Sequence, residues 1–304
     1  MTLWSRRHLL STGLGLAALT ACDRHPTLID PAEPVPPING RIASLEKRHN
    51  AFAGVYAVDV AAGREVAHRD GDPFAMCSTF KTYAVGRLLQ KVERGEVDLE
   101  DPIYIDPSAI VSYSPVTGPQ AGQRMPLSQL CQAALQRSDN TAGNLLLKAI
   151  GGPGAVTEFA RSIGDGATRL DRWETALNSA KPGDPRDTST PRSLGGGYRE
   201  LLTGGVLAEP QRRQLEDWMR GNMTSARSMR AGLPQGWTTA DKTGAGDYGS
   251  TNDIGMAFGP QERTVLLSIM TRSRSDNPDA PMLPQLIADI TTLVLPWLTQ
   301  PQPQ

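Results

Sequence analysis

The chain has 304 residues, enough for about two domains or one large two-lobed unit with a sizeable core. Its 31 lysine and arginine residues nearly balance 32 aspartate and glutamate residues, which excludes the strong basic field typical of nucleic-acid-binding proteins. Aromatic residues make up only 5%, and no aromatic–basic interleaving is visible. Composition therefore indicates a globular body without a nucleic-acid partner.

Residues 1–22 read as a targeting signal rather than as part of the fold. Arg6 and Arg7 precede a short apolar run, residues 9–19, that is too short to span a membrane. The arginine pair resembles a twin-arginine export signal, and an ordinary secretory signal fits equally well. Leu19-Thr20-Ala21-Cys22 resembles a bacterial lipobox, whereas a plain cleavage site beside an incidental cysteine is the alternative. We expect export to the periplasm by the twin-arginine or general secretory route, with a lipid anchor on Cys22.

Residues 23–39 are rich in proline and are expected to form an extended linker. A helix at 41–50, a strand to Val60 and a returning strand at 65–69 then predict a hairpin. Three more strands, at 237–242, 252–258 and 264–271, and a closing helix at 283–298 follow near the other end. Residues 40–76 and 221–298 are therefore expected to build one sheet lobe from both chain ends. Residues 299–304 are expected to be a disordered tail.

Residues 77–220 read as an inserted, all-helical lobe. Helical spacing of apolar residues predicts helices after Ser78, at 127–136, after Asn140, at 153–163, after Pro191 and at 209–220. Gly195-Gly196-Gly197 should make the helix after Pro191 soft. The irregular stretch that begins at residue 169 is longer than a compact domain needs unless it is functional.

Ser78 falls at the expected start of a helix, and Lys81 lies three residues later on the same face. A serine hydroxyl needs a base to become a nucleophile, and a lysine serves only if its pKa is lowered. The helix N-terminus also favours a developing oxyanion. The spacing alone is a weak signal, because Ser44 and Lys47 match it on a polar helix face.

Two further motifs follow in order, Ser138-Asp139-Asn140 between two helices and Lys242-Thr243-Gly244 at a strand end. With Ser78 and Lys81 they resemble the signature of the penicillin-recognising serine enzymes, and residues 41–298 resemble a class A serine β-lactamase. The segment from Arg172 to Asn178 resembles the omega-loop motif of that class, with Thr175 in place of a frequent proline. The omega loop would span 169–187 and be closed by an Arg172–Asp187 ion pair.

The resemblance implies an α+β fold of the α/β three-layer sandwich type, with an antiparallel sheet flanked by helices. It implies hydrolysis of penicillins and cephalosporins through an acyl-enzyme on Ser78, and hence antibiotic resistance. The implied catalytic residues are Ser78, Lys81, Ser138 and Glu174. The implied substrate-binding residues are Tyr113, Asn140, Asn178, Lys242, Thr243, Gly244 and Ala245. We expect no metal, since the sequence has no Cys/His cluster. We also expect no cofactor and a monomeric protein.

Several alternatives stay open at this point. The chain could instead be a peptidoglycan D-alanyl-D-alanine carboxypeptidase, or a sensor that β-lactams acylate without turnover. Many class A members place an arginine near the substrate carboxylate, but Thr251, Ser228 and Met282 or Leu283 occupy the usual positions here. Arg230, Arg272 or Arg274 could substitute.

The cysteines leave a further question. Cys77 and Cys131 could form a disulfide or remain buried thiols. In members that hydrolyse carbapenems well, the cysteine before the nucleophile often pairs with one two residues beyond the Lys-Thr-Gly motif. Here that second position is Gly246, so this pairing cannot form.

Overall fold

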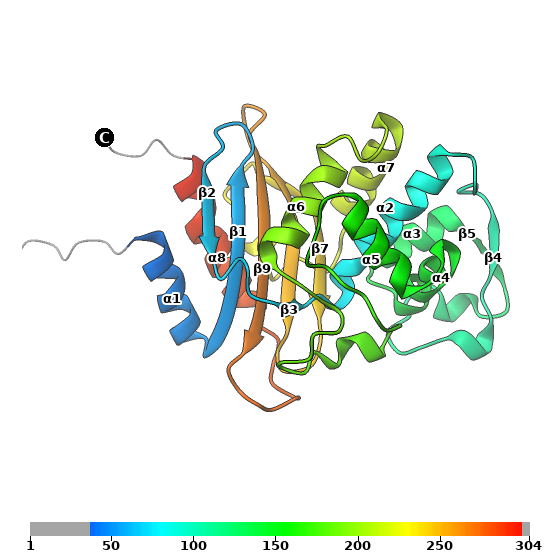
Figure 1. Cartoon of the computed structure of the whole chain (residues 1–304), viewed down its shortest axis with the longest axis horizontal. Coiled ribbons are helices and arrows are strands. Elements are labelled where there is room, and N and C mark those ends of the chain that lie inside the picture. Colours follow the sequence, from blue (N-terminus) through cyan, green and yellow to red (C-terminus); the bar gives the residue numbers. More distant parts are fainter. Residues whose placement is uncertain (1–36, 300–304) are drawn as a thin grey trace, which may run out of the picture. The chain divides into compact units, whose positions relative to one another are not determined.

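The computed structural model describes residues 37–299, so the expected signal, lipobox and most of the linker and tail lie outside the described residues. The described residues all belong to one compact unit. A five-stranded antiparallel sheet runs through it in the order β2-β1-β9-β8-β7 (Figure 1). The strands are β1 Ala51–Asp59, β2 Glu65–His68, β7 Thr238–Ala245, β8 Thr251–Phe258 and β9 Thr264–Ser273.

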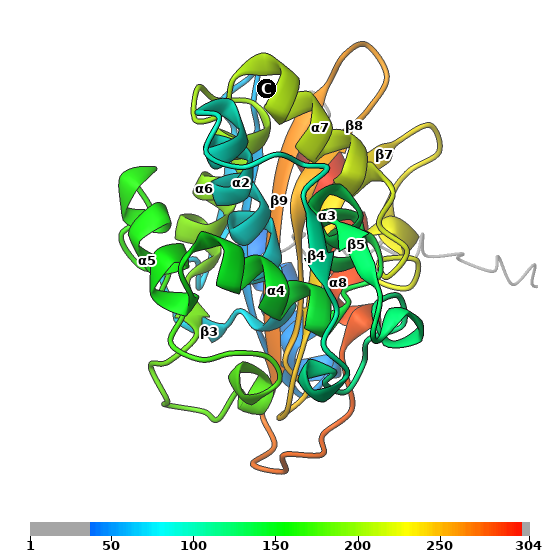
Figure 2. The same ribbon diagram turned by 90° about the vertical axis from the view of Figure 1, so that its right-hand side faces the viewer.

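Helices cover both faces of this sheet (Figure 1). Two terminal helices, α1 Ile38–Arg48 and α8 Pro284–Thr299, pack on one face. The other face carries α2 Phe80–Glu93, α3 Leu127–Gln136, α4 Asn140–Ile150, α5 Pro153–Ser162, α6 Pro191–Leu202 and α7 Glu209–Arg220. Figure 2 shows α4 and α5 in front of the sheet when this layer faces the viewer. The expected α+β sandwich, with a sheet from both chain ends, is confirmed.

Successive side chains of β9 alternate between the two faces of the sheet, so the strand contributes to two hydrophobic cores. Val265, Leu267 and Ile269 point to the terminal helices, whereas Leu266 and Met270 point to the helical layer. Successive strand side chains face opposite ways, so a strand that is apolar throughout is buried on both faces. None of the helices within residues 37–299 is long and apolar enough to cross a membrane.

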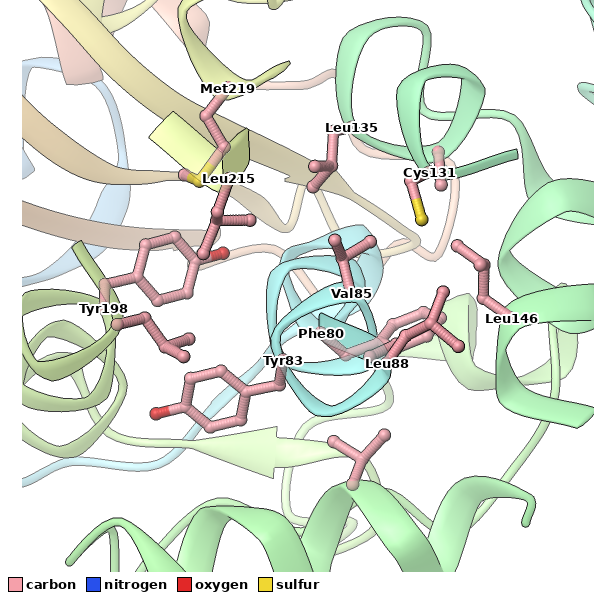
Figure 3. Packing of buried hydrophobic residues seen from close by; sticks show 14 of the residues in the cluster. Phe80, Tyr83, Val85, Leu88, Cys131, Leu135, Leu146, Tyr198, Leu215 and Met219 are labelled. Atoms are coloured by element: carbon pink, nitrogen blue, oxygen red, sulfur yellow. The ribbon is translucent and has the colours of Figure 1, made fainter. Parts of the chain in front are cut away.

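Helix α2 is the centre of the helical layer and is buried almost all round (Figure 3). Phe80, Tyr83, Val85 and Leu88 radiate from it towards residues of α3, α4, α6 and α7. The Tyr83 ring meets Phe159 edge-on at 5.9 Å between centroids. The first half of α2, residues 80–86, is buried on all sides, and it carries the lysine of the first motif into the core.

The glycines of α6 serve close packing. A Cβ at Gly195 would lie 2.8 Å from the Cβ of Ser268 on β9, and one at Gly197 would overlap the Tyr83 hydroxyl. The sheet and α2 therefore approach α6 more closely than a side chain would allow. The glycines are therefore needed for close packing, a role that the sequence, which indicated only a soft helix, did not predict.

Candidate active site

Ser78 lies in a short 3₁₀-helix, Cys77–Thr79, that leads into α2. Sequence periodicity predicted an α-helical start here, whereas the structure has one tighter turn whose first residue, Cys77, adopts φ 49°, in the left-handed region. Asn252 on β8 holds the preceding turn by donating to the carbonyls of Ala75 at 2.8 Å and Met76 at 3.0 Å. Asn252 thus fixes the position of Ser78 at the start of the helix, where the first backbone N–H groups have no partner within the helix.

Lys81 is fully buried and reaches four oxygen atoms. Its Nζ donates to Ser78 Oγ at 2.9 Å, to the Ser138 carbonyl at 2.8 Å and to Asn140 Oδ1 at 2.8 Å. It also lies 3.1 Å from Glu174 Oε1. An ammonium has three hydrogens, so the four acceptors compete for them.

Burial lowers the pKa of the Lys81 ammonium, and the Glu174 carboxylate acts in the opposite direction. A lysine with a lowered pKa can exchange a proton with the hydroxyl that it touches. Gly143 on α4 makes room for this side chain, because a Cβ there would lie 2.8 Å from Lys81 Cε.

Ser138 connects the first motif to the third. Its hydroxyl accepts a hydrogen bond from Lys242 Nζ at 3.1 Å. Lys242 is fully buried, and burial followed by repulsion from Lys81 lowers its pKa to about 7. The three sequence motifs, far apart in the chain, are thereby brought to one place by α2, the α3–α4 connection and β7.

Glu174 points at the nucleophile from the omega loop. Ser78 Oγ donates to Glu174 Oε1 at 3.3 Å, and Asn178 Nδ2 donates to the other carboxylate oxygen at 2.6 Å. Asn178 Oδ1 is buried and accepts no hydrogen bond from the described part of the chain. The carboxylate and this amide oxygen form a pair of acceptors beside Ser78, suited to hold a water molecule.

The loop that carries Glu174 is anchored at two points. Asn144 on α4 accepts from the Glu174 amide at 2.9 Å and donates to its carbonyl at 3.0 Å. The predicted Arg172–Asp187 pair is present at 2.5 Å, and Asp187 also accepts from two loop amides. A carboxylate held by three donors in this way fixes the loop.

Ser78 opens on a cleft of about 590 Å³, and the buried side chains of Lys81, Glu174 and Lys242 are not part of its lining. Tyr113 stands at its edge, 62% exposed, and its carbonyl accepts from the Asn140 amide at 3.0 Å. Asp139 steadies this loop by accepting from the amides of Val116 and Thr117 while it caps α4. Of the predicted site residues, the cleft wall includes Ser78, Tyr113, Ser138, Asn140, Asn178, Thr243, Gly244 and Ala245.

None of the three arginines suggested for the substrate carboxylate lines this cleft. Arg230 pairs with Asp241 at 3.0 Å, and Arg272 and Arg274 stack on Phe52 elsewhere on the sheet. Arg227 lines the cleft instead, and its side chain has no carboxylate within 4.0 Å among residues 37–299.

The end of β7 packs directly against the omega loop. A Cβ at Gly246 would lie 2.6 Å from the Asn178 carbonyl and 2.8 Å from Cys77 Sγ. Asp247 lies on the exposed turn and its amide donates to the Asn178 carbonyl at 2.9 Å. No disulfide joins this end of the strand to Cys77, but the hydrogen bond from Asp247 holds it to the omega loop. Cys77 and Cys131 are both buried, free thiols.

Sequence reasoning assigned no role to five residues that support or line the site, although one of them stands within the second motif: Asp139, Gly143, Asn144, Arg227 and Asn252. Only Asp139 had a local signal, its position as helix N-cap. Within residues 37–299, no group of three or more His, Cys, Asp or Glu could hold a metal ion.

Comparison with known proteins identifies the family to which this chain belongs. A model of the β-lactamase enzyme family matches residues 37–298. A β-lactamase of Streptomyces fradiae is 44% identical over 97% of both chains, and β-lactamase AST-1 of Nocardia asteroides is 43% identical over 95% of both.

Solved structures agree with these matches. A β-lactamase from Streptomyces albus G has a TM-score of 0.83 at 40% identity, covering 86% of this chain and 99% of that one. The carboxypeptidase and sensor alternatives are not favoured. The chain belongs to the class A serine β-lactamases, enzymes that hydrolyse the β-lactam amide of antibiotics and so give resistance.

Proposed function

We propose that Ser78 is the nucleophile of this β-lactamase and that Lys81 and Glu174 receive its proton. Both groups touch the Ser78 hydroxyl, at 2.9 and 3.3 Å. Attack forms the bond from Ser78 Oγ to the lactam carbonyl carbon. The resulting oxyanion lies between the backbone amides of Ser78 and Ala245, which border the same cleft.

Ser138 then supplies the proton that the departing lactam nitrogen needs when the C–N bond breaks. Lys242 donates to the Ser138 hydroxyl and can replace that proton. Thr243 and Lys242 bind the substrate carboxylate, Asn140 binds the side-chain amide, and Tyr113 forms the aromatic wall. Gly244 allows close approach, because a Cβ there would lie 2.6 Å from the Met76 carbonyl beside the nucleophile.

Deacylation follows when Glu174 takes a proton from a water molecule that also donates to Asn178 Oδ1. Hydroxide attacks the acyl carbon, the bond to Ser78 Oγ breaks, and Glu174 returns the proton to Ser78 Oγ, from which it lies 3.3 Å away. The product leaves with a new carboxylic acid, and the Ser78 hydroxyl is restored. The observation that carries this assignment is the buried Glu174 carboxylate 3.3 Å from Ser78, next to an unsatisfied Asn178 oxygen.

A chromogenic cephalosporin tests turnover directly. Continuous hydrolysis at many equivalents per enzyme is expected, with an acyl adduct on Ser78 detectable by mass spectrometry under rapid quench. A single stoichiometric burst would mean that Glu174 and Asn178 do not complete the cycle, and would overturn the proposed roles.

We further propose that the enzyme is an exported monomer held to the membrane by a lipid on Cys22. Export and the anchor are supported by the sequence alone: a basic pair, a short apolar run, the Leu19-Thr20-Ala21-Cys22 box and a proline-rich tether. Export by the twin-arginine or the general secretory route brings the protein to the periplasm, where its substrates enter.

A further inference from the structure

Three arginine side chains surround one aromatic ring at the far end of the sheet from the β1–β2 turn. The guanidinium carbons of Arg69, Arg272 and Arg274 lie 5.3, 4.3 and 4.0 Å from the centroid of Phe52. Phe52 on β1 is the register partner of Arg272 on β9, so the two strands fix this stack. Each guanidinium gains from the ring face, but the three cations repel one another.

Nearby carboxylates leave one of these charges unpaired. The buried Glu46 carboxylate pairs with Arg69 at 2.8 Å and lies 3.9 Å from Arg274. No carboxylate of residues 37–299 lies within 4.0 Å of Arg272, whose Nη1 donates only to the Ser273 carbonyl at 3.2 Å. Burial, then Arg274 and Arg69, lower the pKa of Arg272, while Asp276 acts in the opposite direction.

Arg272 faces a cleft of about 460 Å³ that is separate from the catalytic one. Its other wall is the second half of the omega loop, residues 180–186, which includes Lys181. Lys181 is exposed and, like Arg272, has no carboxylate within 4.0 Å in the described part of the chain. The charged residues of the wall are Arg69, Lys181, Arg186 and Arg272, opposed by Asp72 and Asp184.

The two acids of the wall are already used. Asp184 accepts from Arg186 at 2.7 Å, and Asp72 lies 3.6 Å from Arg69. Two cations of the wall, Arg272 from the sheet and Lys181 from the loop, therefore have no carboxylate within 4.0 Å among residues 37–299. The apolar part of the wall, Phe52, Phe74 and Pro182, lowers the local dielectric and strengthens their field.

We propose that this cleft is a second binding site, for a dianionic phosphate group bridged between Arg272 and Lys181. A planar guanidinium binds two phosphate oxygens at once, and an ammonium binds a third as a compact charge. The ligand is inorganic phosphate or a phosphomonoester with an apolar body that packs on Phe52. Because Lys181 follows Asn178 by three residues, a bound phosphate would tie the omega loop to β9.

Thermal unfolding in sodium phosphate, compared with sodium chloride of equal ionic strength, tests the site in the full-length protein. The wild-type Tm is expected to rise with phosphate and then saturate. Arg272→Gln should abolish the rise and Lys181→Gln should reduce it. Arg213→Gln, which changes an exposed arginine on α7, should leave it intact. Phenyl phosphate should saturate at lower concentration if the apolar wall takes part.

Hydrogen exchange gives a readout that general salt effects would not produce. Phosphate should slow exchange of the amides of the five non-proline residues of 180–186 in the wild type and in Arg213→Gln, but not in Arg272→Gln. An equal Tm rise in wild type and Arg272→Gln, or no saturable rise in the wild type, would overturn the proposal. Neither measurement depends on β-lactam hydrolysis. The catalytic assignments and the phosphate site can therefore be refuted independently of each other.

Discussion

Replacement of Glu174 by glutamine separates the two halves of the catalytic cycle. The Glu174 carboxylate accepts from Asn178 at 2.6 Å and lies 3.1 Å from Lys81 Nζ, so both of its oxygens act as acceptors. A glutamine amide offers only one oxygen, and its NH₂ group must face one of these donors. The variant therefore loses both the base and part of the alignment of Asn178.

The expected cost follows from that chemistry. Loss of a positioned general base slows a step by about 10²–10⁴-fold, which corresponds to about 2.7–5.5 kcal/mol of barrier. Lys81 remains 2.9 Å from Ser78, so acylation should be less affected than deacylation. Removal of the Glu174 charge also removes the interaction that raises the Lys81 pKa, which should fall further and keep Lys81 able to act as a base.

Mass spectrometry and steady-state kinetics measure the two steps. Glu174→Gln mixed with a penicillin should accumulate a stoichiometric adduct on Ser78, while nitrocefin turnover falls by the stated factor. Glu158→Gln, on the exposed side of α5, is the matched control and should behave as wild type. Wild-type turnover in Glu174→Gln, with no adduct, would refute the assignment of the base.

Three further predictions concern the anchor, the spectrum and the carboxylate end of the cleft. Full-length protein should fractionate with membranes and Cys22→Ala should not; wholly soluble wild-type protein would exclude the anchor. Because Gly246 cannot pair with Cys77, kcat/KM for imipenem should be far below the values for penicillins and early cephalosporins, and an equal value would contradict this. Arg227→Gln should raise KM for carboxylate-bearing substrates by roughly 5–10-fold with little change in kcat, and Arg213→Gln is the control.

Much of the fold could be predicted because its signals are local. The expected limits of α3 and α7, residues 127–136 and 209–220, agree with the structure. The apolar spacing lies within each segment, and breaking residues such as Pro126 and Gly221 lie next to it. The 3₁₀ start at Ser78 was not predictable from periodicity. It follows a tertiary contact, in which Asn252 of β8 donates to the Ala75 and Met76 carbonyls just before the turn.

The supporting residues of the site could not be predicted because tertiary contacts define them. Asn144 looks like any polar helix residue until α4 meets the omega loop. The arginine of the cleft could not be predicted for the same reason. Arg230 forms an ion pair with Asp241 on β7, whereas Arg227, three residues earlier, lines the cleft. The spacing of charges along a chain does not say which pairs will meet.

The buried acid Asp253 should make stability depend on pH. Burial, then repulsion from Asp241, raise the pKa of Asp253 to about 8. Between its ordinary value of 3.8 and about 8 the folded state keeps a proton that the unfolded chain releases, so the free energy of unfolding falls as pH rises. Lys242, with its pKa lowered to about 7, contributes the opposite slope between about 7 and 10.5.

Asp253→Asn removes only the contribution of the Asp253 titration to stability. Asparagine keeps an oxygen that can accept from Ser225, Ser228 and the Met229 amide. Urea unfolding at pH 5, 6.5 and 8 should show wild type losing stability relative to Asp253→Asn as pH rises. Asp276→Asn, at an exposed acid, should run parallel to wild type. Parallel curves for wild type and Asp253→Asn would mean that the Asp253 carboxylate ionises near its ordinary pKa, and that the two serine hydroxyls and the Met229 amide are enough to hold its charge.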